Sequence, residues 1–265
     1  MISGRKLKHS IQRRNPCHLQ WEEFLGKAIL QTFGKIISVQ FAYSVGSTDN
    51  RDWVMNALGT VPGHNDVINV HELQQIVRGL KSKKAVGNDG IPSEVHKFAS
   101  ERLLTFMSIF LSECMLSGKI PSTLMHIVII PLLKRKSRDP ADVNNYRPIA
   151  IATALSKVLE QVLLSRLARY LWTADSQFGL KRAHGTEMAI FALKQTVDFY
   201  RNQDTPVYMC FLDAKNTFDR VNYWMLAKKL LDRNVPLHIV KLFIFWYREH
   251  EFMVRWGNAL SMTFR

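Results

Sequence analysis

Two aspartates beside a strongly apolar stretch are the residues whose chemistry the sequence raises first. The segment 207–221 reads VYMCFLDAKNTFDRV, with Asp213 directly after the apolar residues and Asp219 directly after Phe218. A partly desolvated carboxylate needs a cation, a metal ion or hydrogen bonds, and Mg²⁺ is commonly held by one or two carboxylates plus substrate phosphates. Asp also suits turns and helix N-caps, which is what we expect of Asp219. The residues alone leave Asp213 open between metal ligand and turn residue.

A group of cations has the chemistry to bind phosphate. Four of them, beginning with Lys134, lie between residues 134 and 138, and Arg147 follows in the short segment NNYRPI. Arg matches phosphate oxygens with its planar fork, whereas Lys acts as a compact point charge. The other interpretation of such a run is a solvated basic loop. The glycine-containing segment QFGLKRAHGT, residues 177–186, either brings backbone close to a nucleic-acid strand or is a plain connector.

The overall composition favours a polyanionic partner. The 265 residues carry 36 Lys and Arg against 22 Asp and Glu, giving a net charge of +14. Neutralising nucleic-acid phosphates releases counterions, so nucleic acid ranks ahead of a membrane surface. Three scattered cysteines predict a reducing compartment without a disulfide framework or zinc site. The basic amino terminus lacks a signal peptide's apolar core, and the apolar runs are far shorter than the roughly 20 residues that span a membrane. We therefore expect an intracellular, soluble protein.

The elements that must position these residues are helices mixed with short strands. The apolar segment 207–214 predicts a strand buried on both faces, with Asp213 at its carboxyl end. Because helices and strands do not alternate evenly, the pattern predicts an α+β fold. Turns are expected over 44–50 and 60–67. Helices are expected over 18–37, 69–84, 93–119, 154–171 and 222–234, with a break at Gly118 in the third. In the segment 177–200 a turn is expected to precede another helix. Further strands are expected over 127–136, 144–151 and 251–257.

Six short motifs in a fixed order carry a family resemblance. They are A-x-G-x-DGI-x-x-E at 85–94, P-x-x-K at 131–134, NNYRPIAI at 144–151, LSKVLE at 155–160, QFG-x-K at 177–181 and FLDA-x-x-x-FDRV at 211–221. Together they resemble the reverse transcriptase of LINE-type non-LTR retrotransposons over about residues 67–265. The ordered set is far more specific than any single motif.

The resemblance implies a right-hand polymerase, here the fingers and part of a palm with an incomplete palm sheet. It implies RNA as template, DNA as primer, dNTP as substrate, Mg²⁺ as cofactor and a nuclear location. Asp213 matches the first palm aspartate, which binds the catalytic metal ions. Three residues match the dNTP site, with Phe218 excluding a ribose 2′-hydroxyl: Lys134, Arg147 and Phe218. Four match a segment that contacts template and primer: Gln177, Phe178, Gly179 and Lys181.

Departures from the family pattern limit the expected activity. The family's second metal motif contains an Asp-Asp pair, and none occurs in this sequence. Asn216, Thr217 and Leu180 also replace the residues usual at their positions. We therefore expect residues 67–265 to be a domain truncated before that motif and the thumb, preceded by a divergent, partly helical region 1–66, and inactive by itself. The alternatives are a non-catalytic basic nucleic-acid-binding remnant and a fragment that does not fold; the oligomeric state stays open.

Overall fold

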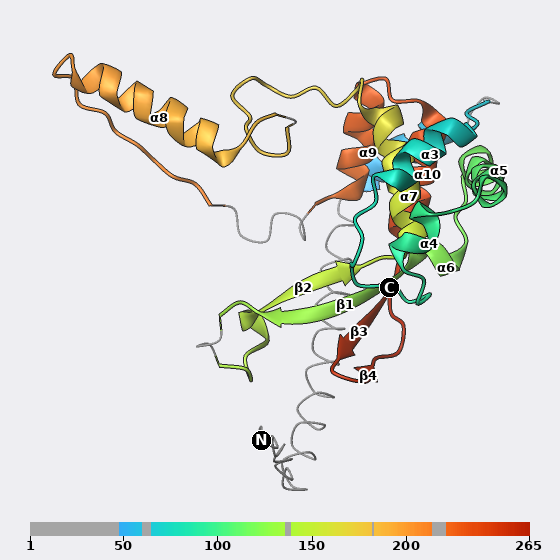
Figure 1. The fold of residues 1–265 in the computed structure, drawn as a ribbon. Coiled ribbons are helices and arrows are strands. Elements are labelled where there is room, and N and C mark those ends of the chain that lie inside the picture. The colour runs from blue at the N-terminus through green and yellow to red at the C-terminus, as the bar shows by residue number, and fades with distance from the viewer. Residues whose placement is uncertain (1–47, 60–64, 136–138, 182, 214–220) are drawn as a thin grey trace, which may run out of the picture.

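The computed structural model describes residues 48–59, 65–135, 139–181, 183–213 and 221–265. Within these ranges the fold is α+β: helices enclose the main core, and a mixed sheet projects from it (Figure 1). Among the described residues, no helix is both long enough and apolar enough to cross a membrane. The helices are α2 Thr48–Leu58, α3 Val70–Arg78, α4 Ser93–Lys97, α5 Glu101–Ser117, α6 Ser122–Met125, the short 3₁₀ helix η1 Val143–Asn145, α7 Ala154–Leu167, α8 Thr186–Arg201, α9 Tyr223–Asp232 and α10 Leu237–Glu249.

Most helices contribute to one apolar core. The helix α7 buries an apolar face there, including Val158, Leu159 and Val162, and α10 contributes Val240 and Leu242. Apolar side chains three or four residues apart share one face of a helix, so each of these helices buries a stripe. The helix α2, from the region before residue 67, packs against α9 and α10.

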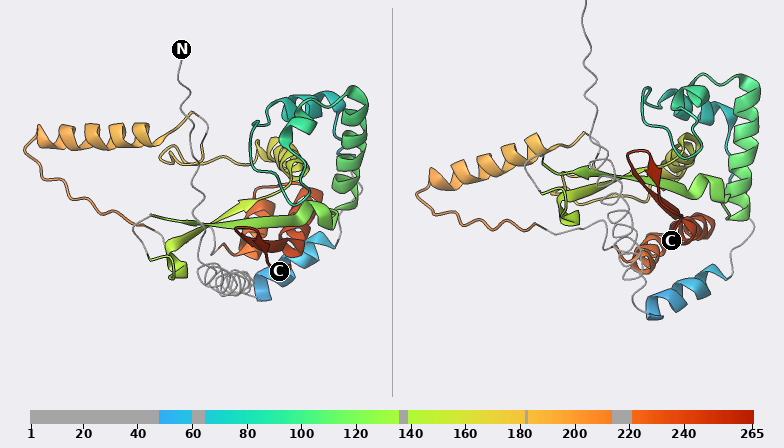
Figure 2. Two further views of the ribbon diagram at one scale, coloured as in Figure 1. Left: turned by 60° about the horizontal axis from the view of Figure 1, so that its bottom comes forward. Right: turned by 90° about the horizontal axis from the view of Figure 1, so that it is seen from below.

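The sheet has the strand order β2-β1-β3-β4. The strands β1 and β2 form an antiparallel hairpin that extends away from the helices (Figures 1 and 2), whereas β3 pairs with β1 in parallel, with His126 opposite Glu251. The strand β4 adds antiparallel to β3. A smaller cluster, which includes Ile129, Phe252 and Val254, packs on this sheet. The bounds are β1 His126–Leu133, β2 Tyr146–Ile151, β3 Glu251–Trp256 and β4 Ala259–Leu260.

Local sequence explains where several helices begin and end. Asn69, Ser100, Thr153 and Asn222 accept hydrogen bonds from backbone N–H groups of the first turn of α3, α5, α7 and α9, which satisfies donors that a helix start leaves unpaired. Gly118 ends α5 in the left-handed region with φ 66°. Glycine adopts this conformation without steric strain because it has no Cβ. The predicted break at Gly118 is confirmed.

The structure differs from the predicted elements at several places. The segment 44–50 was predicted as a turn, but Thr48–Asn50 begin α2. The helix expected over 154–171 ends at Leu167, and α10 was not predicted at all. Its segment LHIVKLFIFWYRE is apolar at most positions, and such a run lacks the polar spacing that identifies a helix. The helix expected over 18–37 lies outside the described residues.

The prediction of a buried strand over 207–214 is wrong for the described residues 207–213. These residues form no strand, and Tyr208 and Leu212 are 91% and 94% exposed. A strand that is apolar on both faces requires paired strands and packed layers around it. The strands described here pair with one another instead, and none pairs with residues 207–213. The preceding helix α8 also stands away from the helical body and buries none of its side chains (Figures 1 and 2).

Candidate functional site

The hairpin of β1 and β2 brings together two of the predicted phosphate-binding residues. Arg147 lies opposite Leu132, and Lys134 follows two positions after Leu132. Because side chains alternate along a strand, Lys134 and Arg147 share one face of the hairpin as diagonal neighbours. Both are exposed. The register therefore puts two exposed cations on one face at the outer end of the projecting sheet, where they could bind a polyphosphate.

The connection between β1 and β2 is fixed by its own polar groups. Lys134 donates from its backbone N to the Asn145 carbonyl at 2.8 Å and from Nζ to the Asn144 carbonyl at 2.7 Å. Asn145 Nδ2 donates to the Asp139 carbonyl at 3.0 Å, and the Tyr146 hydroxyl donates to the Pro140 carbonyl at 2.9 Å. These bonds explain why the NNYR segment forms a definite turn. Residues 136–138, which hold the rest of the predicted basic cluster, lie outside the described residues.

A groove of about 840 Å³ lies between the residues after α3, the strand β2 and one side of α7. Its walls carry three cations, Lys81, Lys84 and Lys157. Glu160 is the carboxylate of this lining; burial raises its pKa, and the nearby Lys157 opposes that shift. Ile149 lies in the apolar part. A groove with cationic walls and an apolar part suits the phosphates and bases of a nucleic-acid strand.

The first motif, residues 85–94, forms one boundary of this groove. The Gly90 N–H bonds to the Gly87 carbonyl at 3.2 Å, Asp89 Oδ1 accepts from the Ile91 N–H at 3.2 Å, and Gly90 has φ 67°. Glu94 accepts from the Lys83 N–H, and this hydrogen bond is the main reason why its pKa is lowered. The motif residues thus fold the loop onto itself, a role that the sequence pattern does not reveal.

The predicted template–primer segment forms a compact loop between α7 and α8. Gln177 Nε2 donates to the Gly179 carbonyl at 3.1 Å, and Lys181 Nζ donates to the Ala174 carbonyl at 3.3 Å. The Phe178 ring lies 5.9 Å from the His184 ring. Leu180, which stands where the family often has an aromatic residue, is 93% exposed and has φ 58°. The structure therefore brings Gln177, Phe178, Gly179 and Lys181 together.

The palm residues are less fully placed. Asp213 is exposed at the end of the extended segment that returns from α8, while Phe218 and Asp219 lie outside the described residues. Within the described ranges, no three His, Cys, Asp or Glu side chains gather as metal ligands. Asp213 thus belongs to no cluster of three ligands among the described residues, and one carboxylate by itself does not make a magnesium site.

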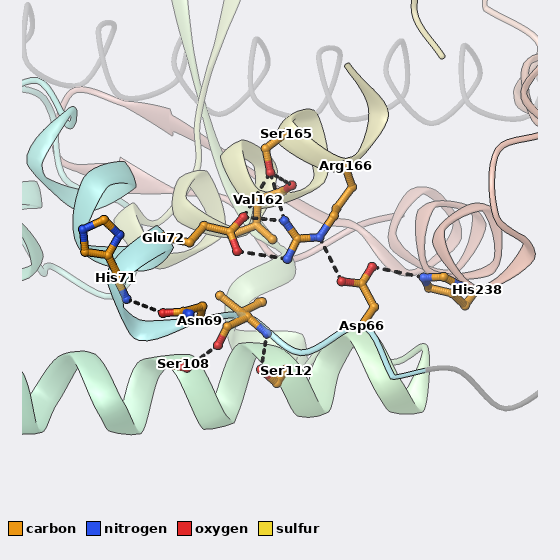
Figure 3. Close-up of polar contacts among 11 residues, drawn as sticks. Asp66, Asn69, His71, Glu72, Ser108, Ser112, Val162, Ser165, Arg166 and His238 are labelled. Carbon is orange, nitrogen blue, oxygen red and sulfur yellow. Dashed lines mark hydrogen bonds and ion pairs between the residues drawn. The ribbon is translucent and has the colours of Figure 1, made fainter. Parts of the chain in front are cut away.

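A polar network that sequence reasoning missed joins three helical segments (Figure 3). Arg166 of α7 donates from Nε to Asp66 Oδ1 at 2.8 Å and binds both oxygens of Glu72 in α3, with Nη2 3.0 Å from Oε2. Asp66 Oδ2 lies 3.2 Å from Nε2 of His238 in α10. Arg166 lies four positions after Val162 on α7. No sequence motif distinguishes it from an ordinary surface arginine. The network holds together the helices that carry the groove.

Comparison with known proteins gives a consistent identification. Residues 133–262 match the reverse transcriptase (RNA-dependent DNA polymerase) family. The RNA-directed DNA polymerase from mobile element jockey of Drosophila funebris is 27% identical over 160 residues, which are 59% of this chain and 17% of that protein. The corresponding jockey protein of Drosophila melanogaster is 26% identical over 67% of this chain and 20% of its own length.

A third relative belongs to another element. The Pol polyprotein from type-1 retrotransposable element R2 of Popillia japonica is 30% identical over 162 residues, 60% of this chain and 21% of that protein. The chain thus spans about one fifth of the length of these relatives. The match begins at Leu133, directly before Lys134, and includes the segment around Asp213. Residues 133–262 thus match the reverse transcriptase domain, and the chain is similar to the RNA-directed DNA polymerases of non-LTR retrotransposons.

Proposed function

We propose that this chain supplies the fingers and part of the palm of an RNA-directed DNA polymerase, with an RNA template, a DNA primer and dNTP as substrates. The observation that carries the proposal is the adjacency of Lys134 and Arg147 on the β1–β2 hairpin, inside a domain of this family. These two side chains would bind the triphosphate, Arg147 through the paired N–H groups of its guanidinium and Lys134 through the point charge of its ammonium.

The groove beside α7 is our candidate for the template strand. Lys81, Lys84 and Lys157 line it, and cations along a groove follow a phosphate backbone without regard to sequence. The loop that contains Gln177 and Lys181 would contact the same template–primer duplex. In the folded chain this assigns the nucleotide to the hairpin and the template to the groove.

Asp213 is proposed as one ligand of Mg²⁺, and Phe218 as the residue that excludes ribonucleotides. Reverse transcriptases as a family use divalent metal ions. Since Asp213 alone does not make a magnesium site, the remaining ligands would have to come from outside the described residues. The division into a region 1–66 and a polymerase domain 67–265 belongs to the same proposal.

Equilibrium binding of dNTP tests the nucleotide site. A fluorescent dTTP analogue should bind the chain, and Arg147→Ala and Lys134→Ala should each weaken binding by about 10- to 100-fold, because each removes a charge-assisted hydrogen-bond donor worth about 1.5–3 kcal/mol. Arg201→Ala, at the end of the exposed α8, is the matched control and should bind normally. Equal affinity of all four proteins would contradict the proposal.

The second candidate is a chain that binds nucleic acid without polymerising it. The exposed, unpaired setting of residues 207–213 favours this candidate, because catalysis requires Asp213 to be held rigidly. It predicts RNA binding that falls steeply with salt and is unchanged in Asp213→Ala. Nucleotide binding that depends on Lys134 and Arg147 would instead support the polymerase proposal over this second candidate.

A further inference from the structure

The turn that follows α7 presents an unusually exposed tryptophan. Tyr170 closes this turn, donating its N–H to the Leu167 carbonyl at 2.8 Å, and it packs against the helical core. Two residues later Trp172 is 70% exposed. Tyr170 thus anchors the turn, while the indole of Trp172 stands in solvent, where it adds little to the buried apolar surface.

Arg233, directly after α9, holds this turn in position. Its Nη1 donates to the carbonyls of Tyr170 at 3.3 Å and Trp172 at 3.1 Å. Its guanidinium carbon lies 4.7 Å from the centroid of the Trp172 ring, within the range of a cation–π contact. The two hydrogen bonds to backbone carbonyls hold the turn without any contribution from the Trp172 side chain. The position of the turn therefore does not require a large aromatic residue at 172.

A second cation lies at the same turn. The guanidinium carbon of Arg169 is 4.8 Å from the Tyr170 ring centroid, and Arg169 is exposed. Asp232 is the exposed carboxylate beside Arg233 in the sequence, and Asp175 pairs with Lys181 at 3.6 Å. Trp172, Arg169 and Arg233 therefore combine a fixed aromatic ring with two guanidinium groups; we call these three residues the Trp172 platform.

We propose that the Trp172 platform stacks one base of a single-stranded nucleic acid, with Arg169 and Arg233 near the adjoining phosphates. An exposed aromatic face takes any base, whereas the bases of a duplex are already stacked on one another. The charge of +14 on the chain suits this partner. The platform uses none of Asp213, Lys134 or Arg147, so it is a binding site additional to the polymerase site, and it does not depend on catalysis.

Fluorescence anisotropy with labelled 12-nucleotide oligo(U), oligo(dT) and a 12-base-pair duplex tests this site in the full chain. EDTA is present and nucleotides are omitted, so failure of the proposed polymerase activity cannot affect the result. Trp172→Ala should weaken binding of both single strands by roughly 5- to 100-fold, the range for losing one stacked base. Trp172→Phe should stay within about 3-fold of the natural chain, because an aromatic face remains.

Two controls distinguish stacking from a general loss of structure or charge. Phe98→Ala removes another aromatic side chain, 77% exposed, and should leave binding unchanged. A 12-residue abasic sugar-phosphate strand should bind the natural chain and Trp172→Ala equally, because it has no base to stack. Equal oligo(U) and oligo(dT) affinities for the natural chain and Trp172→Ala would overturn the proposal. An equal loss with the abasic strand or the duplex would overturn it as well.

Discussion

Gly87 lies against the backbone of Thr153 so closely that a Cβ on Gly87 would stand 2.6 Å from the Thr153 Cα and 2.8 Å from its N. Thr153 is the N-cap of α7, and its Oγ1 accepts from the Ser156 N–H at 3.1 Å. The loop of the first motif is thereby seated on the start of the helix that lines the groove. This contact explains the first glycine of the A-x-G-x-DGI motif, Gly87, by close packing.

Replacing Gly87 with alanine is expected to destabilise the fold by about 1–3 kcal/mol, since backbone must shift to make room for the methyl group. Gly179→Ala is the matched control because nothing lies within 4 Å of the Cβ that it would add. Urea denaturation measures both changes. A Gly87→Ala chain as stable as the Gly179→Ala chain would contradict the close packing.

Arg166→Met should destabilise the chain by about 2–4 kcal/mol, because it leaves the partly buried carboxylates of Asp66 and Glu72 without their main partner. Arg201→Met removes an exposed arginine and should change stability by less than about 0.5 kcal/mol. Thermal and urea unfolding give the comparison. Similar stabilities of the two variants would show that the network contributes nothing to the fold.

The same network predicts an acid-dependent loss of stability. Burial raises the pKa of Asp66, but the hydrogen bonds from Arg166 and His238 and their charges outweigh it, so the pKa lies below its ordinary value of 3.8. A carboxylate with a lowered pKa stabilises the fold above its unfolded-state pKa, and this contribution is lost as pH falls through the folded-state pKa. In Asp66→Asn, urea midpoints measured from pH 5 to pH 2 should fall less steeply than in the natural chain.

His250 predicts a second loss of stability at higher pH. Burial lowers its pKa from 6.5 to about 4, beside the rings of Trp246 and Phe252. The folded state therefore binds fewer protons than the unfolded state between these values, and stability declines by up to about 3 kcal/mol as pH falls from 6.5 to 4. His250→Phe should lack this decline, whereas exchanging the exposed His71 for Phe should retain it. Parallel pH profiles of His250→Phe and the natural chain would refute the assignment.

Primer extension tests the expectation that these 265 residues do not polymerise alone. With an RNA template, DNA primer, dNTP and Mg²⁺ we expect no product, since the sequence contains no Asp-Asp pair to join Asp213. Steady incorporation that Asp213→Ala abolishes would disprove this. In a chimaera that joins this chain to the downstream part of a jockey-type relative, Phe218→Val should admit ribonucleotides. Unchanged sugar discrimination there would remove Phe218 from that role.

Sequence reasoning succeeded where a local signal determined the structure. The apolar stripe around Val158 and Val162 and the break at Gly118 each act within a few residues, and the helix α7 and the end of α5 follow from them. The sequence also predicted both strands that bring Lys134 and Arg147 onto one hairpin, and two strands joined by a short connection can form such a hairpin.

The sequence could not show features that depend on distant partners. The Arg166 network joins residues 94 positions apart, and the Trp172 platform needs Arg233, 61 positions away. The apolar segment 207–213 has the composition of a buried strand, but burial requires neighbours that composition does not specify. A mostly apolar segment such as α10 is also compatible with either helix or strand.

The parallel pairing of β1 with β3 joins strands that are far apart in the sequence, and this determines the order in which the sheet folds. His126 and Glu251 face each other across 125 positions of sequence and bond at 2.8 Å. Closing so long a loop costs conformational entropy before its contacts form, whereas the β1–β2 hairpin and the helices close over short distances. During synthesis the hairpin would form early and acquire its inner neighbour only after residue 254 has emerged. Because β3 pairs only with residues 126–129 of β1, the outer end of the hairpin with its cations would be complete before β3 arrives.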